Sequence, residues 1–172
     1  MLTNKTNKVL AFIGAGNMAT SLFGGLIKQG FDPKKLRVSD PDQNQRDKAA
    51  TLGVKTFTDN SVCLKDAKFV LICVKPQLVK DVCRALKPAQ DQVIISIAAG
   101  ITISNLEAWS SKKQPIIRCM PNTPALIQQG ISALYANNHT TDKQKREAEQ
   151  ILTAIGQTLW VDEESKIDIV TA

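Results

Sequence analysis

The sequence contains a single histidine, His139, and its four cysteines do not stand at the spacing of a metal-binding motif. We therefore expect no metal site. His139 lies between Asn138 and Thr140, a polar setting typical of a surface loop. Paired carboxylates and the Ser-His-Asp arrangement of hydrolases are not visible either. The pattern therefore assigns no catalytic residue to this chain.

No apolar run approaches the length that spans a membrane, and the first eight residues lack the apolar core of a secretion signal. The net charge of +6 is scattered, and aromatic residues make up only 5% of the chain, so a stacking platform for nucleic acid is lacking. Cys73 and Cys119 stand in or beside apolar segments, as small core residues do. Cysteines without a disulfide framework indicate the reducing cytoplasm. We therefore expect a cytoplasmic protein that binds neither membrane nor nucleic acid.

The strongest pattern lies near the start of the chain. Residues 9–13 are apolar without polar alternation, which is typical of a strand buried on both faces of a parallel sheet. The sequence Gly-x-Gly-x-x-Ala follows from Gly14 to Ala19, and a helical apolar pattern begins at Ser21. A strand, a glycine-rich turn and a helix in this order form the dinucleotide-binding fingerprint.

Each small residue of this motif has a physical reason. Gly14 permits a tight turn, Gly16 lets the backbone approach a pyrophosphate, and Ala19 keeps the helix close to the strand. The free N–H groups at the helix N-terminus favour an anion. The alternative is a tight turn without a ligand.

A second strand, residues 36–40, ends in Asp40, where an acid can accept hydrogen bonds from the adenosine ribose. The alternative is a turn and helix cap over residues 40–42. An acid here repels a 2′-phosphate and favours NAD(H), whereas Ser39 and Arg46 leave NADP(H) open. Asn60 follows the short strand 54–57 and is placed near the same ligand.

Further strands are predicted at residues 69–74, 93–97, 114–119, 130–136 and 159–161. Helices are predicted over residues 42–52, 76–86, 102–107 and 141–155. Leu78, Val79, Val82 and Leu86 supply the expected buried stripe of one helix. This order predicts an α/β fold of the Rossmann type, with a doubly wound, mainly parallel sheet and helices on both faces.

Ligands of such a sheet bind outside the carboxyl ends of its strands. Segments 75–77, 98–100 and 120–125 stand at such ends. From the residues alone, each is also readable as an ordinary helix start or structural turn.

Residues 163–172 begin as a helix with acids in the first turn. Its apolar residues Ile167, Ile169 and Val170 have nothing after them to cover them. We therefore expect a dinucleotide-binding domain over residues 1–163. Residues 164–172 would start a helix leading to a further domain that is absent from this chain.

Four segments together resemble pyrroline-5-carboxylate reductase, in the same order and at fitting separations: Phe12–Ala19, Val74–Gln77, Ala98–Ile103 and Arg118–Ala125. The most specific is Met-Pro-Asn-Thr-Pro at residues 120–124. The resemblance implies reduction of 1-pyrroline-5-carboxylate to L-proline with NADP(H) or NAD(H), the last step of proline biosynthesis. It also implies a small imino-acid substrate and a homo-oligomer, both served by a C-terminal helical dimerisation domain.

The resemblance further implies a set of cofactor-binding residues. On the pyrophosphate side these are Ile13, Gly14, Ala15, Gly16, Asn17 and Met18, and on the adenosine side Ser39, Asp40 and Asn60. Along the cofactor they are Cys73, Val74, Lys75, Pro76, Ile97, Ala98 and Ala99, and beside the nicotinamide Met120, Asn122 and Thr123. Alternatives are a β-hydroxyacid dehydrogenase, a deazaflavin-dependent NADP reductase and a non-catalytic dinucleotide-binding module.

Overall fold

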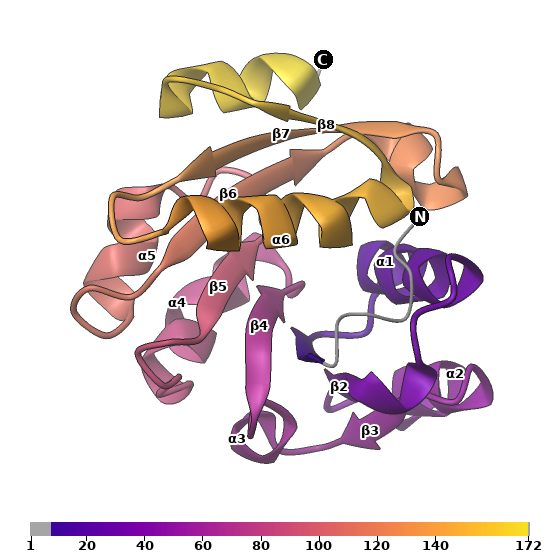
Figure 1. Ribbon diagram of the computed structural model, residues 1–172. Coiled ribbons are helices and arrows are strands. Elements are labelled where there is room, and N and C mark those ends of the chain that lie inside the picture. The colour runs from indigo at the N-terminus through magenta and orange to yellow at the C-terminus, as the bar shows by residue number, and fades with distance from the viewer. Residues whose placement is uncertain (1–7, 172) are drawn as a thin grey trace.

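The computed structural model describes residues 8–171, without the side chains of residues 168–171. The described residues form an eight-stranded sheet in the order β3-β2-β1-β4-β5-β6-β7-β8 (Figure 1). The strands are β1 Val9–Ile13, β2 Leu36–Ser39, β3 Lys55–Phe57, β4 Ala67–Ile72, β5 Val93–Ser96, β6 Ile116–Pro121, β7 Gly130–Ala136 and β8 Gly156–Trp160.

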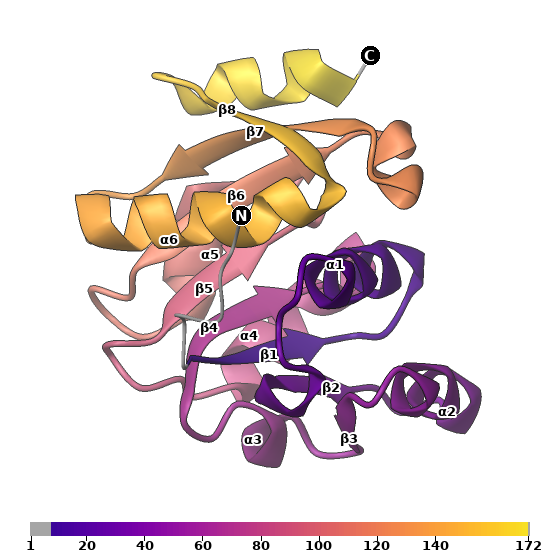
Figure 2. The same ribbon diagram turned by 45° about the vertical axis from the view of Figure 1, so that its right-hand side comes forward.

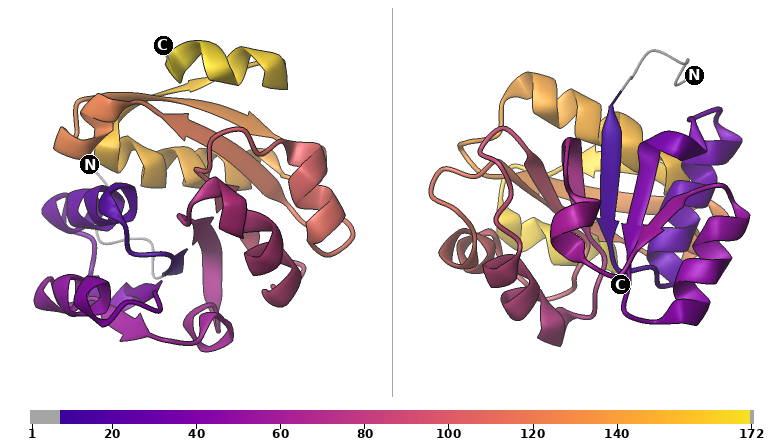
Figure 3. Two further views of the ribbon diagram at one scale, coloured as in Figure 1. Left: turned by 180° about the vertical axis from the view of Figure 1, so that it is seen from behind. Right: turned by 90° about the horizontal axis from the view of Figure 1, so that it is seen from below.

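Helices cover both faces of this sheet (Figures 2 and 3). The α-helices are α1 Asn17–Lys28, α2 Gln43–Thr51, α3 Asn60–Cys63, α4 Pro76–Ala85, α5 Ile103–Trp109 and α6 Asp142–Leu152. The described residues also form four 3₁₀ segments, which are η1 Pro33–Lys35, η2 Thr123–Ile127, η3 Thr153–Ile155 and η4 Glu164–Thr171. Among residues 8–171, no helix has the length and apolarity needed to cross a membrane.

Six strands, β1 to β6, run parallel, whereas β7 is antiparallel to β6, and β8 is parallel to β7. The predicted Rossmann-type, mainly parallel architecture is therefore confirmed. The chain proceeds from β1 outward to β2 and β3, and then returns to place β4 on the other side of β1. This reversal is the topological switch point, beside which ligands of open α/β sheets bind.

Strand β1 consists of apolar residues without polar ones between them, because it lies in the interior of the sheet between β2 and β4. Leu10 and Phe12 pack with α1, α2 and α6 on one face, and Ala11 and Ile13 pack with α3, α4 and α5 on the other. Because both faces are covered, every position of the strand is apolar.

Helix α1 begins at Asn17, four residues before the apolar pattern that starts at Ser21, and Ala19 in its first turn is buried. One local expectation on the helices is wrong. In α4, Leu78 is 49% exposed, whereas Val79, Cys83 and Leu86 are buried. The buried positions are spaced four and three residues apart, and Leu78 lies one residue, or about 100°, off that stripe.

The C-terminal segment also differs from the expectation. Ile167 is fully buried rather than uncovered. Segment η4 packs against β6 and β7, and Glu164 accepts a hydrogen bond from the backbone N–H of Ile103 at 2.7 Å. The segment thus docks on the sheet, which residue patterns alone do not reveal. The side chains of Ile169 and Val170 lie outside the described residues.

Candidate dinucleotide site

The turn between β1 and α1 lies between the carboxyl ends of β2 and β4. The N–H of Gly14 donates to the carbonyl oxygen of Ser39 at 2.7 Å, and the N–H of Cys73 donates to that of Ile13 at 2.8 Å. Gly14 has a φ of +100°, and a Cβ there would lie 2.8 Å from the carbonyl oxygen of Cys73. The fold itself therefore requires glycine at position 14.

Gly16 differs from Gly14 because the fold does not require a glycine there. Its φ is −67°, a value open to any residue, and a Cβ would meet no atom within 4 Å. The open space lies at the N-cap of α1, which has neither a capping side chain nor an acid in its first turn. A ligand that approaches the backbone would account for the glycine. The unsatisfied N–H groups and the helix dipole favour an anion as that ligand.

Asp40 stands directly after β2 and is fixed by two backbone donors. Its Oδ2 accepts a hydrogen bond from the N–H of Ala15 at 2.8 Å, and its Oδ1 accepts one from the N–H of Asp42 at 2.9 Å. The acid therefore joins the glycine turn to the loop before α2. Sequence reasoning named both segments but missed this bond between them.

Two more polar residues lie beside Asp40. The Ser39 hydroxyl is buried and donates to Oδ1 of Asn60 at 2.6 Å. Within residues 8–171 the Asn60 amide nitrogen has no hydrogen-bond partner. The fold thus brings together the three residues predicted for the adenosine side.

A hollow of about 400 Å³ lies next to these residues, between α2 and α3. Its lining is Gln43, Arg46, Thr56, Phe57, Thr58, Asp59 and Val62. The Arg46 guanidinium donates to the carbonyl oxygens of Asp40 at 2.6 Å and of Pro41 at 2.8 Å. It also donates to the side chain of Gln43. Sequence reasoning identified Arg46, but not that the loop itself holds it.

The predicted residues after β4 and β5 also lie at this edge of the sheet. Cys73 and Val74 are partly exposed, and Lys75 and Pro76, which begin α4, are exposed. Burial of its sulfur raises the pKa of the Cys73 thiol, so the group stays neutral. After β5, Ala98 is buried, Ile97 is partly exposed and Ala99 is exposed. Apart from Lys75, small or apolar groups therefore line this part of the edge.

The segment at the end of β6 is held by Asn122. Its Oδ1 accepts a hydrogen bond from the N–H of Ile131 at 2.9 Å, and its own N–H donates to the Ile131 carbonyl at 3.2 Å. Its side-chain oxygen thus fixes the loop to β7. Met120 is partly exposed on β6, and Thr123 is exposed at the start of η2. All of the predicted site residues therefore lie at or just after the carboxyl ends of β1, β2, β3, β4, β5 and β6.

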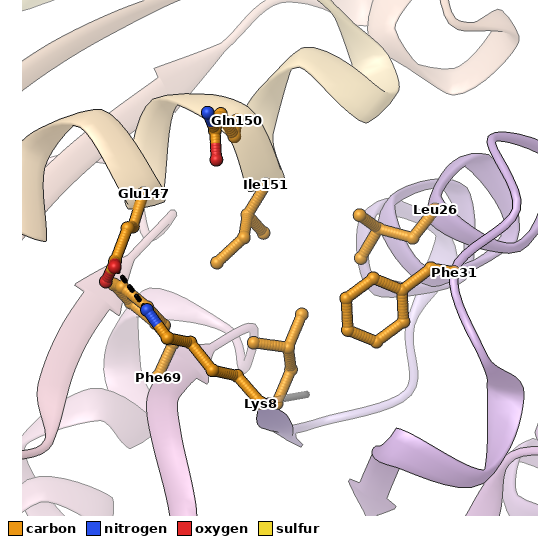
Figure 4. Close-up of a pocket in the computed structure, with 8 residues that line it drawn as sticks. Lys8, Leu26, Phe31, Phe69, Glu147, Gln150 and Ile151 are labelled. Carbon is orange, nitrogen blue, oxygen red and sulfur yellow. Dashed lines mark ion pairs between the residues drawn. The ribbon is translucent and has the colours of Figure 1, made fainter. Parts of the chain in front are cut away.

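Another cavity lies away from this edge, between α1 and α6 (Figure 4). It measures about 10 Å³ and is lined by Leu26, Phe31, Phe69 and Ile151, with a Lys8–Glu147 ion pair at its side. Since Lys8 precedes β1, the cavity stands at the opposite end of the strand from Gly14. It has room for one water molecule and not for a cofactor. Among residues 8–171, no group of three or more histidine, cysteine or acidic side chains could hold a metal ion.

The chain is similar to proteins of known family. Residues 9–100 match the family described as NADP oxidoreductase, coenzyme F420-dependent. A pyrroline-5-carboxylate reductase of Pseudomonas aeruginosa is 50% identical over 95% of this chain and 61% of its own length. The chain therefore spans about three fifths of the length of that relative.

Solved structures agree with this similarity. The structure of a pyrroline-5-carboxylate reductase from Coxiella burnetii is 35% identical, with a TM-score of 0.91 over 95% of this chain and 62% of the other. That of the Plasmodium falciparum enzyme with NADP bound is 24% identical, with a TM-score of 0.84 over 95% of this chain and 60% of the other. At 24% identity the second structure supports the fold alone. The resemblance read from the sequence is confirmed by the first.

Proposed function

Because this chain belongs to the family described as NADP oxidoreductase, coenzyme F420-dependent, we propose that it is the dinucleotide-binding part of an oxidoreductase. The reaction of the whole protein would be the reduction of 1-pyrroline-5-carboxylate to L-proline, the last step of proline biosynthesis. The observation that supports the assignment of this reaction is the similarity of nearly the whole chain to pyrroline-5-carboxylate reductases.

The residues at the edge of the sheet fit a nicotinamide dinucleotide, NADP(H) or NAD(H). The N-terminus of α1 and the open space at Gly16 would receive the pyrophosphate, and Asp40 and Asn60 would receive the adenosine ribose. The remaining contacts would come from Cys73, Val74, Lys75, Pro76, Ile97, Ala98, Ala99, Met120, Asn122 and Thr123. When bound, the reduced nicotinamide supplies the hydride for the imine carbon of the substrate.

This chain would bind and orient the cofactor rather than supply an acid or a base. Asn122 would hold the loop beside the nicotinamide in one position, because its amide is tied to β7. Met120 would present an apolar surface next to it. The groups that hold the imino acid, and a homo-oligomer interface, would belong to the part of the relatives outside the match.

The alternatives are less well supported. The family description mentions coenzyme F420, but it matches only residues 9–100, whereas the similarity to pyrroline-5-carboxylate reductases extends over 95% of the chain.

A cytoplasmic location is favoured by the four cysteines, all of which are free and three of which are buried.

A chimera tests the reaction directly. In it, this chain replaces the segment that it matches in the Pseudomonas aeruginosa relative. With 1-pyrroline-5-carboxylate and reduced dinucleotide, we expect stoichiometric formation of proline and oxidised cofactor, measured by amino-acid analysis and absorbance.

The matched control is the same chimera with Gly16→Val, which we expect to form no proline while remaining folded. A folded Gly16-containing chimera that binds dinucleotide but forms no proline would contradict the proposed reaction. It would favour a dinucleotide-binding module with another role.

A further inference from the structure

The carboxylate of Asp40 has little freedom to move. One of its oxygens is bonded to the N–H of Ala15 in the glycine turn, and the other to the N–H of Asp42 in the following loop. Swinging the side chain away would leave both donors without their acceptor, and Ala15 is a buried residue. An unsatisfied buried N–H is costly, so the negative charge is held beside the glycine turn.

The fixed carboxylate still has acceptor capacity. A carboxylate offers about four lone-pair sites, and Ala15 and Asp42 occupy two of them. The two vacant sites suit a pair of neighbouring hydroxyl donors, which is what an unmodified ribose presents. A 2′-phosphate is mostly deprotonated at neutral pH, so it offers few protons for hydrogen bonds, and it would bring up to two further negative charges against the same carboxylate.

Arg46 is the cationic side chain that contacts this loop, and its guanidinium already donates hydrogen bonds within the protein. Arg46 donates to the carbonyl oxygens of Asp40 and Pro41 and to the side chain of Gln43. An arginine that serves a 2′-phosphate must direct its donors at that group. Arg46 would have to give up these bonds first, and it would then meet a phosphate that Asp40 repels.

We propose that this chain binds NAD(H) in preference to NADP(H), and that Asp40 is the residue that sets the preference. This inference rests on the dinucleotide binding proposed above, and it names the form of the cofactor. Neither the family description nor the curated relatives decide it, and the NADP in the Plasmodium falciparum structure belongs to a protein only 24% identical to this chain. Repulsion between two neighbouring charges at a partly exposed site corresponds to an affinity difference of about tenfold or more.

Calorimetric titration of the 172-residue chain with NADH and with NADPH tests the preference. We expect NADH to bind about tenfold or more tightly. In Asp40→Asn the charge is removed but one amide oxygen remains as an acceptor, so the ratio should fall towards one, mainly because NADPH binds better. Circular dichroism and thermal unfolding of the variant show whether its fold is kept.

Asp47→Asn is the matched control. It removes the same charge from α2, where Asp47 is exposed and accepts a hydrogen bond from Gln43. The ratio of the two affinities should stay at the value of the unsubstituted chain. A fall as large as that in Asp40→Asn would show that overall charge rather than Asp40 sets the preference, and would overturn the proposal.

Two other results have separate meanings. Equal or tighter binding of NADPH by the unsubstituted chain overturns the preference for NAD(H) and leaves the proposed function standing. Arg46→Gln would then be expected to lose the NADPH affinity. Failure of the folded chain to bind either dinucleotide overturns dinucleotide binding by this chain, and this inference with it.

Discussion

The backbone N–H of Ala15 and Oδ2 of Asp40, which are 25 residues apart in the sequence, form a hydrogen bond of 2.8 Å. It is accompanied by the bond from Gly14 to Ser39, so the glycine turn is fixed to the end of β2 at two successive residues. The turn that would receive the pyrophosphate and the acid that would receive the ribose are therefore one connected unit. A change at Asp40 is expected to act on both.

Gly16→Val tests whether the open space at the start of α1 is a ligand site. The φ of Gly16 suits valine, and no atom lies within 4 Å of its Cβ position. We expect a change in unfolding free energy of about 0.5 kcal/mol or less, as at other open surface positions. Dinucleotide affinity should fall by about a hundredfold or more, since the side chain would fill the space of the pyrophosphate. Calorimetry and urea unfolding measure the two effects.

Gly24→Ala is the control for this variant. Gly24 also belongs to α1, and its Cβ would likewise meet nothing within 4 Å. Alanine in a helix interior should stabilise the fold by about 0.5–1 kcal/mol and leave dinucleotide affinity unchanged. Unchanged affinity in Gly16→Val would contradict the assignment of this turn to the pyrophosphate.

Gly14→Ala, unlike Gly16→Val, is expected to destabilise the fold itself. A φ of +100° is strained for alanine, and the new Cβ would lie 2.8 Å from the carbonyl oxygen of Cys73. We expect a loss of about 2 kcal/mol or more in unfolding free energy, from strain and from the displaced backbone. Urea unfolding without any ligand measures it. A loss below about 0.5 kcal/mol would show that the turn relaxes and that glycine is not required there.

The pattern of apolar residues predicted the strands and the fold class because both depend on local periodicity. A strand such as β1, buried on both faces, has no polar position, and the glycine motif has a fixed place after it. The first residue of α1 does not follow from the apolar pattern, which starts four residues later at Ser21, because the helix has no capping side chain to mark its beginning.

Contacts between residues on different elements could not be predicted from local sequence patterns. Asn122 was predicted to lie beside the nicotinamide, and the sequence does not reveal that its oxygen accepts the N–H of Ile131, which a neighbouring strand supplies. Ile167 was predicted to be uncovered, and it is buried because η4 folds back on β6 and β7. In both cases the partner lies on another element, and no local pattern marks it.

Glu164→Ala tests the docking of η4. Oε1 of Glu164 lies 3.3 Å from the Arg118 guanidinium and accepts the N–H of Ile103 at the start of α5. Arg118 is only 2% exposed, so loss of this partner leaves a buried charge less well compensated. Because Glu164 is itself partly exposed, and Arg118 has a further interaction, we expect a loss of about 2 kcal/mol.

The neighbouring variant Glu163→Ala provides the comparison for this change. Glu163 is exposed and lies 3.9 Å from Lys166, a surface pair of little energetic value. Its removal should change the unfolding free energy by about 0.5 kcal/mol or less in urea. Equal effects of the two variants would show that η4 contributes nothing through Arg118.

The buried thiols predict a pH dependence of stability. Burial raises the pKa of Cys119 to about 12, from an ordinary value of 9.0. The folded chain therefore keeps this thiol protonated where the unfolded chain has lost the proton. The contribution to stability is complete below pH 9 and is lost as the pH rises towards about 12, at about 1.4 kcal/mol per pH unit.

Cys119→Ala isolates this effect from the lysines and tyrosine that titrate in the same range. The cavity left by the sulfur lowers the unfolding free energy equally at every pH, so only the slope reports the thiol. Between pH 9 and 11 the variant should lose stability less steeply than the unsubstituted chain, by about 1.4 kcal/mol per pH unit in urea. Parallel slopes would mean that the Cys119 thiol ionises in the folded chain as readily as in the unfolded one, and hence that it is open to solvent.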